Sequence, residues 1–267
     1  MCIRDRDDVF FVITKSIFIP CMGSQENLKM ASFTRKERKG FIEITGEIGT
    51  GKTTLCRAIL NDLDAATKTA FILNPRLSEI QFIRSILEDF GIMVKKDSKF
   101  EMIKALNGFL LEQLSNGNNV VLIIDEAQNL KNNLLEEIRL LSNLETEKEK
   151  LFQIILAGQP ELRNKLASPD LAQLRQRIAI RYHMLPLEKH DIEGYINHRL
   201  AVAGSDGRIV FAQDSIDEIY NYSKGVPRLI NIVCDRAMLL GYVEEIMEFH
   251  RDTIVKAISE IENLVVR

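Results

Sequence analysis

The chain has 267 residues, of which 46% are hydrophobic and 27% are charged, so it is long enough for one large domain or two unequal ones. Its formal net charge of -3 excludes a global basic field that would attract nucleic acid. None of the four cysteines belongs to a C-x-x-C pair, which indicates reduced thiols rather than a zinc site or a disulfide framework.

The first thirty residues differ from the rest of the chain. An apolar run at residues 9–19 is interrupted by polar side chains and is shorter than the roughly 20 residues needed to span a bilayer. Acidic residues precede the run and no small-x-small cleavage site follows it, so it is not typical of a signal peptide. The opening MCIRDR resembles translated sequencing-adapter sequence. We therefore interpret residues 1–30 as an uncertain or non-native segment.

Strands and helices alternate from residue 40 to residue 184. Strands are expected at 41–45, 69–73, 120–124, 151–157 and 178–184. Helices are expected at 52–63, from Ser78 to about 90, at 99–114, around residues 134–141, after Pro160 and at 171–177. The strand at 120–124 has no polar alternation, which is typical of a central parallel strand covered on both faces. The pattern predicts an α/β sandwich with a mainly parallel five-stranded sheet.

Strand signals stop after Pro186. Four helical segments remain, near 188–203, 213–223, 227–241 and 251–264. This change predicts a core domain over 31–186 and a small all-helical domain over 187–267.

A complete G-x-x-x-x-G-K-[ST] motif lies between the first strand and the first helix. This context favours a phosphate-binding loop, because the glycines allow a tight backbone whose N–H groups point at phosphate oxygens. The predicted nucleotide-binding residues are Gly46, Glu47, Ile48, Gly49, Thr50, Gly51, Lys52, Thr53 and Thr54. Lys52 is expected to reach the β- and γ-phosphates, and the Thr53 hydroxyl to bind Mg²⁺. Thr54 is open to two roles, phosphate contact or helix packing.

Two carboxylates, Asp125 and Glu126, follow the most apolar strand. Asp125 is expected to hold Mg²⁺ opposite Thr53, and Glu126 to polarise the attacking water. The alternative is a surface pair that begins the next helix. Two carboxylates rather than one favour a hydrolase over a transferase.

Longer segments resemble AAA+ ATPases of the ExeA type, also called general secretion pathway protein A. The matching segments include GEIGTGKTTLCRAIL, VLIIDEAQNL, LAGQPELRNKLASPDLAQLRQRIAIRYHMLPL and GVPRLINIVCDRAMLLGY. The resemblance implies a three-layer P-loop core with a helical lid, and an oligomer with shared active sites, in a ring or filament. It also implies ATP and Mg²⁺ as ligands.

The resemblance also implies roles for single residues. Gln159 matches the sensor-1 position near the γ-phosphate, and Arg228 matches the sensor-2 arginine of the lid. Arg177 matches the arginine finger that acts on a neighbouring subunit, with Arg175 as the alternative. Each of these could instead be an ordinary loop or surface residue.

The implied function is to drive assembly or remodelling of a secretion or cell-envelope system, through a protein partner. The implied location is the cytoplasm, or the inner face of the bacterial membrane through that partner, with no membrane span in this chain. One alternative is a DNA-associated ATPase resembling transposition ATPases, to which the basic residues 29–39 would contribute. Another is a non-hydrolysing nucleotide switch. The aromatic FGL…PF segment of the family is missing or scrambled, which puts the adenine pocket in doubt.

Overall fold

The structure is a computed structural model that describes residues 40–73, 75, 77–94, 98–142 and 151–265. The N-terminal segment at 1–30 and the basic stretch at 29–39 lie outside the described residues, as does the charged run at 145–150.

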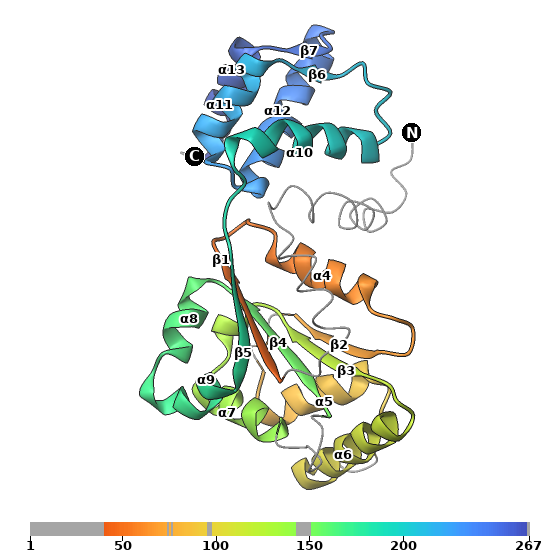
Figure 1. Cartoon of the computed structure of the whole chain (residues 1–267). Helices are drawn as coiled ribbons and strands as arrows, with labels where there is room; N and C mark the ends of the chain where they lie inside the picture. The colour runs from red at the N-terminus through yellow and green to blue at the C-terminus, as the bar shows by residue number, and fades with distance from the viewer. Residues whose placement is uncertain (1–39, 74, 76, 95–97, 143–150, 266–267) are drawn as a thin grey trace. The chain divides into compact units, whose positions relative to one another are not determined.

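Five strands form one parallel sheet in the order β2-β3-β4-β1-β5 (Figure 1). Their bounds are β1 (Phe41–Gly46), β2 (Lys68–Ile72), β3 (Val120–Ile124), β4 (Gln153–Gly158) and β5 (Ile178–Met184). Every pairing in this sheet is parallel, and Thr45 near the end of β1 lies opposite Gly158 of β4 and His183 of β5. The expected five-stranded parallel sheet is therefore confirmed.

The burial of each strand follows from its place in the sheet. All five residues of β3 are buried, as its uniform apolar sequence predicts for a strand with neighbours and helices on both sides. Strand β5 lies at an edge and alternates between half-buried and exposed residues until Met184. Its exposed Arg181 lies opposite the buried Glu43 of β1, and their side chains form an ion pair at 3.3 Å.

Helices follow the strands at the expected places. They are α4 (Lys52–Asp62), α5 (Glu79–Asp89), α6 (Lys99–Ser115), α7 (Asn132–Leu141), α8 (Pro160–Leu166) and α9 (Ala172–Arg177), with short 3-10 turns η1 (Ala127–Asn129) and η2 (Pro169–Leu171). Helix α5 begins where Ser78 and Gln81 form a capping box, which satisfies backbone N–H groups at the helix start. Helix α7 buries one apolar stripe that includes Leu134, Ile138 and Leu141.

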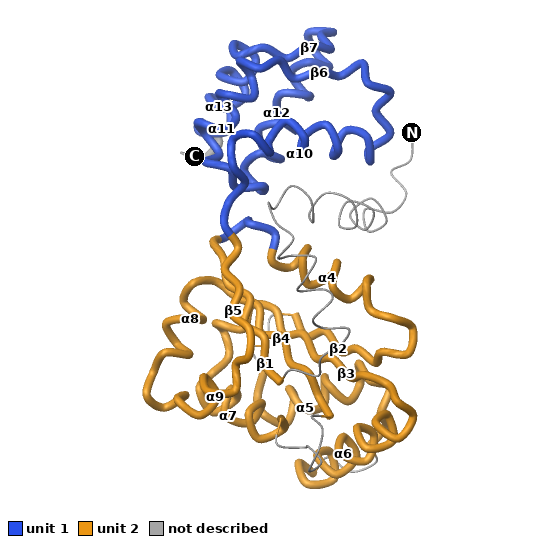
Figure 2. Tube along the Cα trace, viewed as in Figure 1, with its two compact units in different colours: residues 1–27, 48–51, 185–267 blue, residues 28–47, 52–184 orange. Residues whose placement is uncertain are grey.

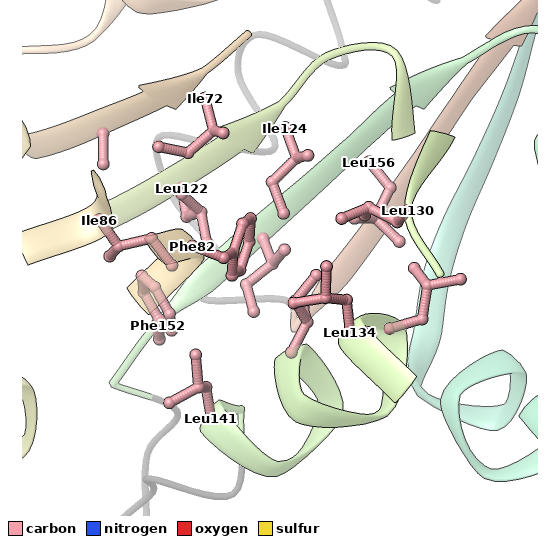
Figure 3. Packing of buried hydrophobic residues seen from close by; sticks show 14 of the residues in the cluster. Ile72, Phe82, Ile86, Leu122, Ile124, Leu130, Leu134, Leu141, Phe152 and Leu156 are labelled. Atoms are coloured by element: carbon pink, nitrogen blue, oxygen red, sulfur yellow. The ribbon is translucent and has the colours of Figure 1, made fainter. Parts of the chain in front are cut away.

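The main core lies between one face of the sheet and helices α5 and α7 (Figure 3). Leu122, Ile124 and Leu156 point from the strands toward Phe82 of α5 and Leu134 of α7. Because side chains alternate along a strand, the intervening residues face the opposite side, where α4 contacts β1 and β4. The result is the three-layer arrangement that the sequence predicts.

A second group of helices follows β5. It comprises α10 (Lys189–Val202), α11 (Gln213–Ser223), α12 (Pro227–Glu244) and α13 (Arg251–Val265), with a hydrophobic core of its own. Two short strands, β6 (Val210–Phe211) and β7 (Glu248–Phe249), also pair in parallel, and the rings of Phe211 and Phe249 stack with centroids 4.9 Å apart. This part of the chain is therefore not entirely helical, in contrast to the expectation for 187–267. The sequence did not indicate β6 and β7, because a two-residue strand is too short to produce an alternating pattern.

Two compact units divide the chain (Figure 2). Among the described residues, unit 2 contains β1 and Glu47, followed by Lys52–Met184. Unit 1 contains Ile48–Gly51 and the chain from Leu185 onward. We propose that they correspond to the core and lid domains expected over 31–186 and 187–267. Among the described helices, none combines the length and apolar character needed to cross a membrane.

Candidate nucleotide-binding and hydrolysis site

The sheet topology explains why distant polar residues meet. Strands β3, β4 and β1 are neighbours and run in the same direction, so the segments after them emerge at one edge of the sheet. Asp125 and Glu126 follow β3, Gln159 follows β4, and the phosphate loop follows β1. In parallel α/β proteins this edge is where ligands bind.

The phosphate loop has the backbone that its glycines allow. Gly46 is the buried end of β1, and Gly49 and Gly51 adopt positive φ angles of 81° and 98°. Glycine reaches this conformation without the steric cost that a Cβ imposes. Thr50 is fully buried, whereas Glu47 and Ile48 are exposed. The loop then enters α4 at Lys52, which places the start of a helix beside it.

The Lys52 side chain is buried and folds back over the loop. Its Nζ donates hydrogen bonds to the carbonyls of Gly46 and Glu47, each at 2.8 Å. Burial lowers the pKa of Lys52 below its usual range, and the carboxylates of Glu126 and Asp125 act in the opposite direction. A buried ammonium at the mouth of a glycine-rich loop fits the phosphate-binding role predicted for Lys52.

Thr53 and Asp125 form a close polar pair in the site. The Thr53 hydroxyl donates to Asp125 Oδ2 at 2.5 Å, and Asp125 Oδ1 accepts from the backbone N–H of Glu126 at 2.9 Å. A hydroxyl and a carboxylate are hard oxygen donors, the type that Mg²⁺ prefers. No group of three or more His, Cys, Asp or Glu side chains suited to a metal occurs among the described residues. The pair fits Mg²⁺, which uses few protein ligands when phosphates and water complete its shell.

Glu126 has a left-handed backbone, with φ 53° and ψ 36°. Non-glycine residues rarely adopt this conformation, and such residues often mark functional sites. Two amides hold its carboxylate: Gln128 Nε2 donates to Glu126 Oε2 at 2.5 Å, and Gln159 Nε2 donates to the same oxygen at 3.3 Å. The structure thus brings together Glu126 and Gln159, two residues predicted to act on the γ-phosphate.

Gln128 is a site residue that the sequence analysis missed. Its Oε1 accepts a hydrogen bond from the backbone N–H of Gln159 at 3.1 Å, so one side chain joins the segments after β3 and β4. Gly158 makes room for it, because a Cβ there would lie 2.7 Å from Gln128 Oε1. The available signal was the position of Gln128, two residues after the predicted catalytic carboxylate.

Lys165 of α8 holds the backbone of the η1 turn, to which Gln128 belongs. Its Nζ donates to the carbonyls of Gln128 and Leu130 at 2.6 and 2.7 Å. These hydrogen bonds give the backbone carbonyls at the end of η1 a partner and join η1 to α8. No motif or spacing indicates Lys165, since its partners are backbone atoms 35 and 37 residues away.

Within unit 1, Arg228 lies beside the tip of the phosphate loop. The Arg228 backbone N–H donates to the Gly49 carbonyl at 3.2 Å, and a Cβ on Gly49 would lie 2.7 Å from Arg228 Cβ. The Arg228 side chain is exposed. Gly49 is therefore needed both for its positive φ and for this close approach.

The two arginines considered for the finger lie at the end of α9. Arg177 is half-buried, and its Nη1 donates to the Ser142 hydroxyl at 3.0 Å. Arg175 is exposed and donates to the carbonyl of Ala167 at 3.1 Å. Thr54 is half-buried in the first turn of α4, which leaves both of its expected roles open.

The sheet order, the phosphate loop after β1 and the acidic pair after β3 define a P-loop protein of the AAA class. Residues 35–166 match the family model described as an AAA domain. General secretion pathway protein A of Aeromonas hydrophila is 41% identical to the chain over 218 residues. The chain belongs to this ExeA-type family of AAA ATPases. The match covers 81% of the chain but only 40% of the Aeromonas protein.

Solved structures share the fold at low sequence identity. Cdc6p from Pyrobaculum aerophilum has a TM-score of 0.70 and 17% identity, with 96% of this chain and 71% of that chain covered. The ORC2 protein of Aeropyrum pernix, solved as ADPNP-ADP complexes, has a TM-score of 0.65 and 16% identity, with coverage of 88% and 67%. These likenesses show the AAA+ fold.

Proposed function

We propose that the chain binds ATP with Mg²⁺ and hydrolyses the bond between its β- and γ-phosphates. The observation that carries the proposal is the 2.5 Å pair of Thr53 and Asp125, one residue from Lys52 and Glu126 respectively. The Lys52 ammonium, the oxygen donors of Thr53 and Asp125, and the Glu126 carboxylate therefore lie at one edge of the sheet. Each has a separate role in phosphoryl transfer.

Lys52 and the N–H groups of the loop bind the phosphates. The buried Lys52 ammonium, now held by two carbonyls, would exchange them for phosphate oxygens and neutralise charge that develops on the leaving group. Thr53 and Asp125 would hold Mg²⁺, which supplies further charge neutralisation when bound.

Glu126 is the proposed general base. Its carboxylate accepts a proton from water as the water oxygen forms a bond to the γ-phosphorus, and the bond from that phosphorus to the bridging oxygen breaks. ADP and inorganic phosphate leave. Gln159 and Gln128 orient the carboxylate through the hydrogen bonds that their side-chain amides donate to its Oε2. Gln159 is also proposed to respond to the γ-phosphate, as the sensor-1 position implies.

Arginines are proposed to complete the site. Arg228 is the proposed sensor-2 residue, supported by its backbone contact with Gly49 of the loop. Arg177 is the proposed finger that a neighbouring copy receives, with Arg175 as the alternative. An arginine finger acting in trans raises turnover by about 10³–10⁵-fold in other NTPases. The proposal therefore includes a homo-oligomer, ring or filament, with shared active sites.

The proposed task is assembly or remodelling of a secretion or cell-envelope system. The support is the 41% identity to general secretion pathway protein A, of which the chain spans 40%. We propose a cytoplasmic location, or one at the inner face of the membrane through a protein partner. A DNA-associated role uses the same chemistry, so the experiment must separate the two.

The test is steady-state phosphate release from ATP, measured over a range of protein concentrations, with EDTA or Mg²⁺ and with or without DNA. We expect Mg²⁺-dependent turnover that rises per mole of protein with concentration and does not respond to DNA. Glu126→Gln should retain ATP binding and lose about 10²–10⁴-fold in turnover. Lys52→Ala should lose nucleotide binding, whereas the matched change of the exposed Arg57→Ala on the same helix should not.

Normal turnover in Glu126→Gln would contradict the assignment of the base. Stimulation by DNA with a steep dependence on salt would move the function to the DNA-associated class.

A further inference from the structure

The C-terminal half of α12 exposes large apolar side chains. Tyr242 is 87% exposed and Val243 is 74% exposed, and Met247 in the following turn is 52% exposed. Single exposed apolar residues are ordinary, but a contiguous group commonly marks a protein–protein or membrane contact. These three are close in sequence and line one hollow.

That hollow is a groove of about 620 Å³ between α12 and the turn that leads into β7. Gly241 forms part of its lining, and the Phe249 ring packs against this glycine, where a Cβ would lie 2.5 Å from the ring. A second cavity of about 290 Å³ between α10 and α12 shares Ile209 and Met238 with the groove. The combined surface is wide enough for several side chains of an extended or helical segment. Methionine makes such surfaces adaptable.

Three glutamates form what we call the rim of the groove: Glu245 lines the groove, and Glu244 and Glu248 are near it in sequence. Glu244, Glu245 and Glu248 are all exposed and lie at or just beyond the end of α12, whose last turn has no basic residue. The C-terminus of a helix carries a partial negative charge, so carboxylates there are unfavourable for the isolated fold. Glu244 pairs with Lys256 at 3.2 Å, and Glu248 lies 3.5 Å from the His250 imidazole, which is charged only when protonated. Glu245 makes no ion pair or hydrogen bond through its side chain within the described residues. The three exposed carboxylates thus give the rim a negative charge, and that of Glu245, which lines the groove, has no partner among the described residues.

We propose that this groove docks an amphipathic segment of a partner protein in which lysine or arginine flanks apolar residues. Apolar side chains would fill the hollow beside Tyr242 and Val243, and basic side chains would meet the glutamates of the rim. The acidic rim disfavours an anionic bilayer surface and nucleic acid, since both are negatively charged. The inference rests on the proposed function for the existence of a partner, but ATP hydrolysis plays no part in the docking.

The probe is a fluorescent 14-residue peptide with leucine at helical spacing and lysine at the other positions. The control peptide has the same sequence with glutamate in place of every lysine. Titration of the full chain by fluorescence anisotropy should show saturable binding of the lysine peptide and none of the glutamate peptide.

Three variants locate the site on the chain. Tyr242→Ser combined with Val243→Ser should weaken binding of the lysine peptide about tenfold or more. Glu245→Asn combined with Glu248→Gln should weaken it and reduce its salt dependence, and asparagine suits the left-handed backbone at 245. Met93→Ser, which changes a 97% exposed apolar side chain elsewhere, should leave binding unchanged.

The proposal is overturned if neither peptide binds, if both bind equally, or if the Tyr242 and Val243 double variant binds as well as the original chain. Binding to anionic vesicles that this double variant loses would assign the surface to a membrane instead. Self-association in sedimentation that the same variant loses would assign it to a second copy. ATP turnover is measured in parallel: peptide binding without turnover would refute the hydrolase and leave the docking site standing.

Discussion

The amide of Gln128 donates a 2.5 Å hydrogen bond to Glu126 Oε2, on the carboxylate that would activate water. The other end of the Gln128 amide accepts from the Gln159 backbone. One side chain therefore fixes the proposed base relative to the proposed sensor. The carboxylate that it fixes belongs to a residue with a left-handed backbone, a conformation that costs about 1–3 kcal/mol.

Replacing Gln128 should impair catalysis more than binding. We expect Gln128→Leu to lower kcat by about tenfold or more while the KM for ATP changes little, because the carboxylate keeps its identity and loses its orientation. Gln128→Glu, of similar size, should be no better, since it places a second carboxylate against Glu126. Steady-state kinetics with a separate measurement of nucleotide affinity checks this, and an unchanged kcat in Gln128→Leu would remove the positioning role.

Mixing experiments can identify the arginine finger. Arg177→Ala should lower turnover by several orders of magnitude, as removal of a finger does elsewhere, while ATP still binds. A mixture of Arg177→Ala with Glu126→Gln should recover part of the activity, because a mixed oligomer contains some sites with both an intact base and an intact finger. Arg175→Ala is the matched control on the same helix. If Arg175→Ala is instead inactive alone and regains activity when mixed with Glu126→Gln, the finger is Arg175.

Two glycines of unit 1, Gly225 and Gly204, allow the cost of a positive φ to be compared with the cost of a steric clash. Both have positive φ, 78° and 83°. A Cβ on Gly225 would lie 1.9 Å from the Leu187 carbonyl oxygen, whereas a Cβ on Gly204 would meet nothing within 4 Å.

Gly204→Ala should therefore cost only the conformational term, about 1–2 kcal/mol of the free energy of unfolding. Gly225→Ala should cost clearly more, because the backbone must shift and disturb the bond from the Leu187 N–H to the Gly225 carbonyl. Urea denaturation of both variants compares the two costs. Equal losses would show that the crowding at Leu187 relaxes freely.

The expected pH dependence at Glu43 follows from its burial. Burial raises the pKa of Glu43 above 4.5, although the nearby guanidinium of Arg181 acts in the opposite direction. A carboxyl with a higher pKa in the folded chain holds its proton more tightly there. Its stabilising contribution is thus complete below the unfolded pKa and is lost as pH rises through the folded pKa.

Glu43→Gln removes this titration. The variant should gain stability relative to the original chain as pH rises above 4.5, as measured by urea denaturation at several pH values up to 8. The exposed Glu112→Gln controls for the change in net charge. A stability difference that is constant with pH, or that moves in the opposite direction, would contradict the assignment.

Local patterns in the sequence predicted most of the fold. The uniformly apolar 120–124 segment predicted the central strand, and Ser78 marked the start of a helix. Fixed spacing was enough for the phosphate loop, because its chemistry is contained in eight consecutive residues. The family resemblance added Gln159, Arg177 and Arg228, whose roles stay predictions.

Other features depend on topology and could not be read from spacing. Gln128 and Lys165 act on backbone groups that the sheet order and helix α8 bring to them from 31 or more residues away. Strands β6 and β7 have two residues each, too few for a period to be visible. The rim and groove at the end of α12 required knowledge of which apolar side chains remain uncovered.

The order of the sheet also has a consequence for synthesis on the ribosome. Phe41 at the start of β1 pairs with Ile154 of β4 and Ile178 of β5, so both neighbours of β1 are translated more than a hundred residues after it. Pairings of this separation form late and slowly. The nascent chain therefore carries its phosphate loop through roughly a hundred further residues of translation before the two strands that flank β1 are made.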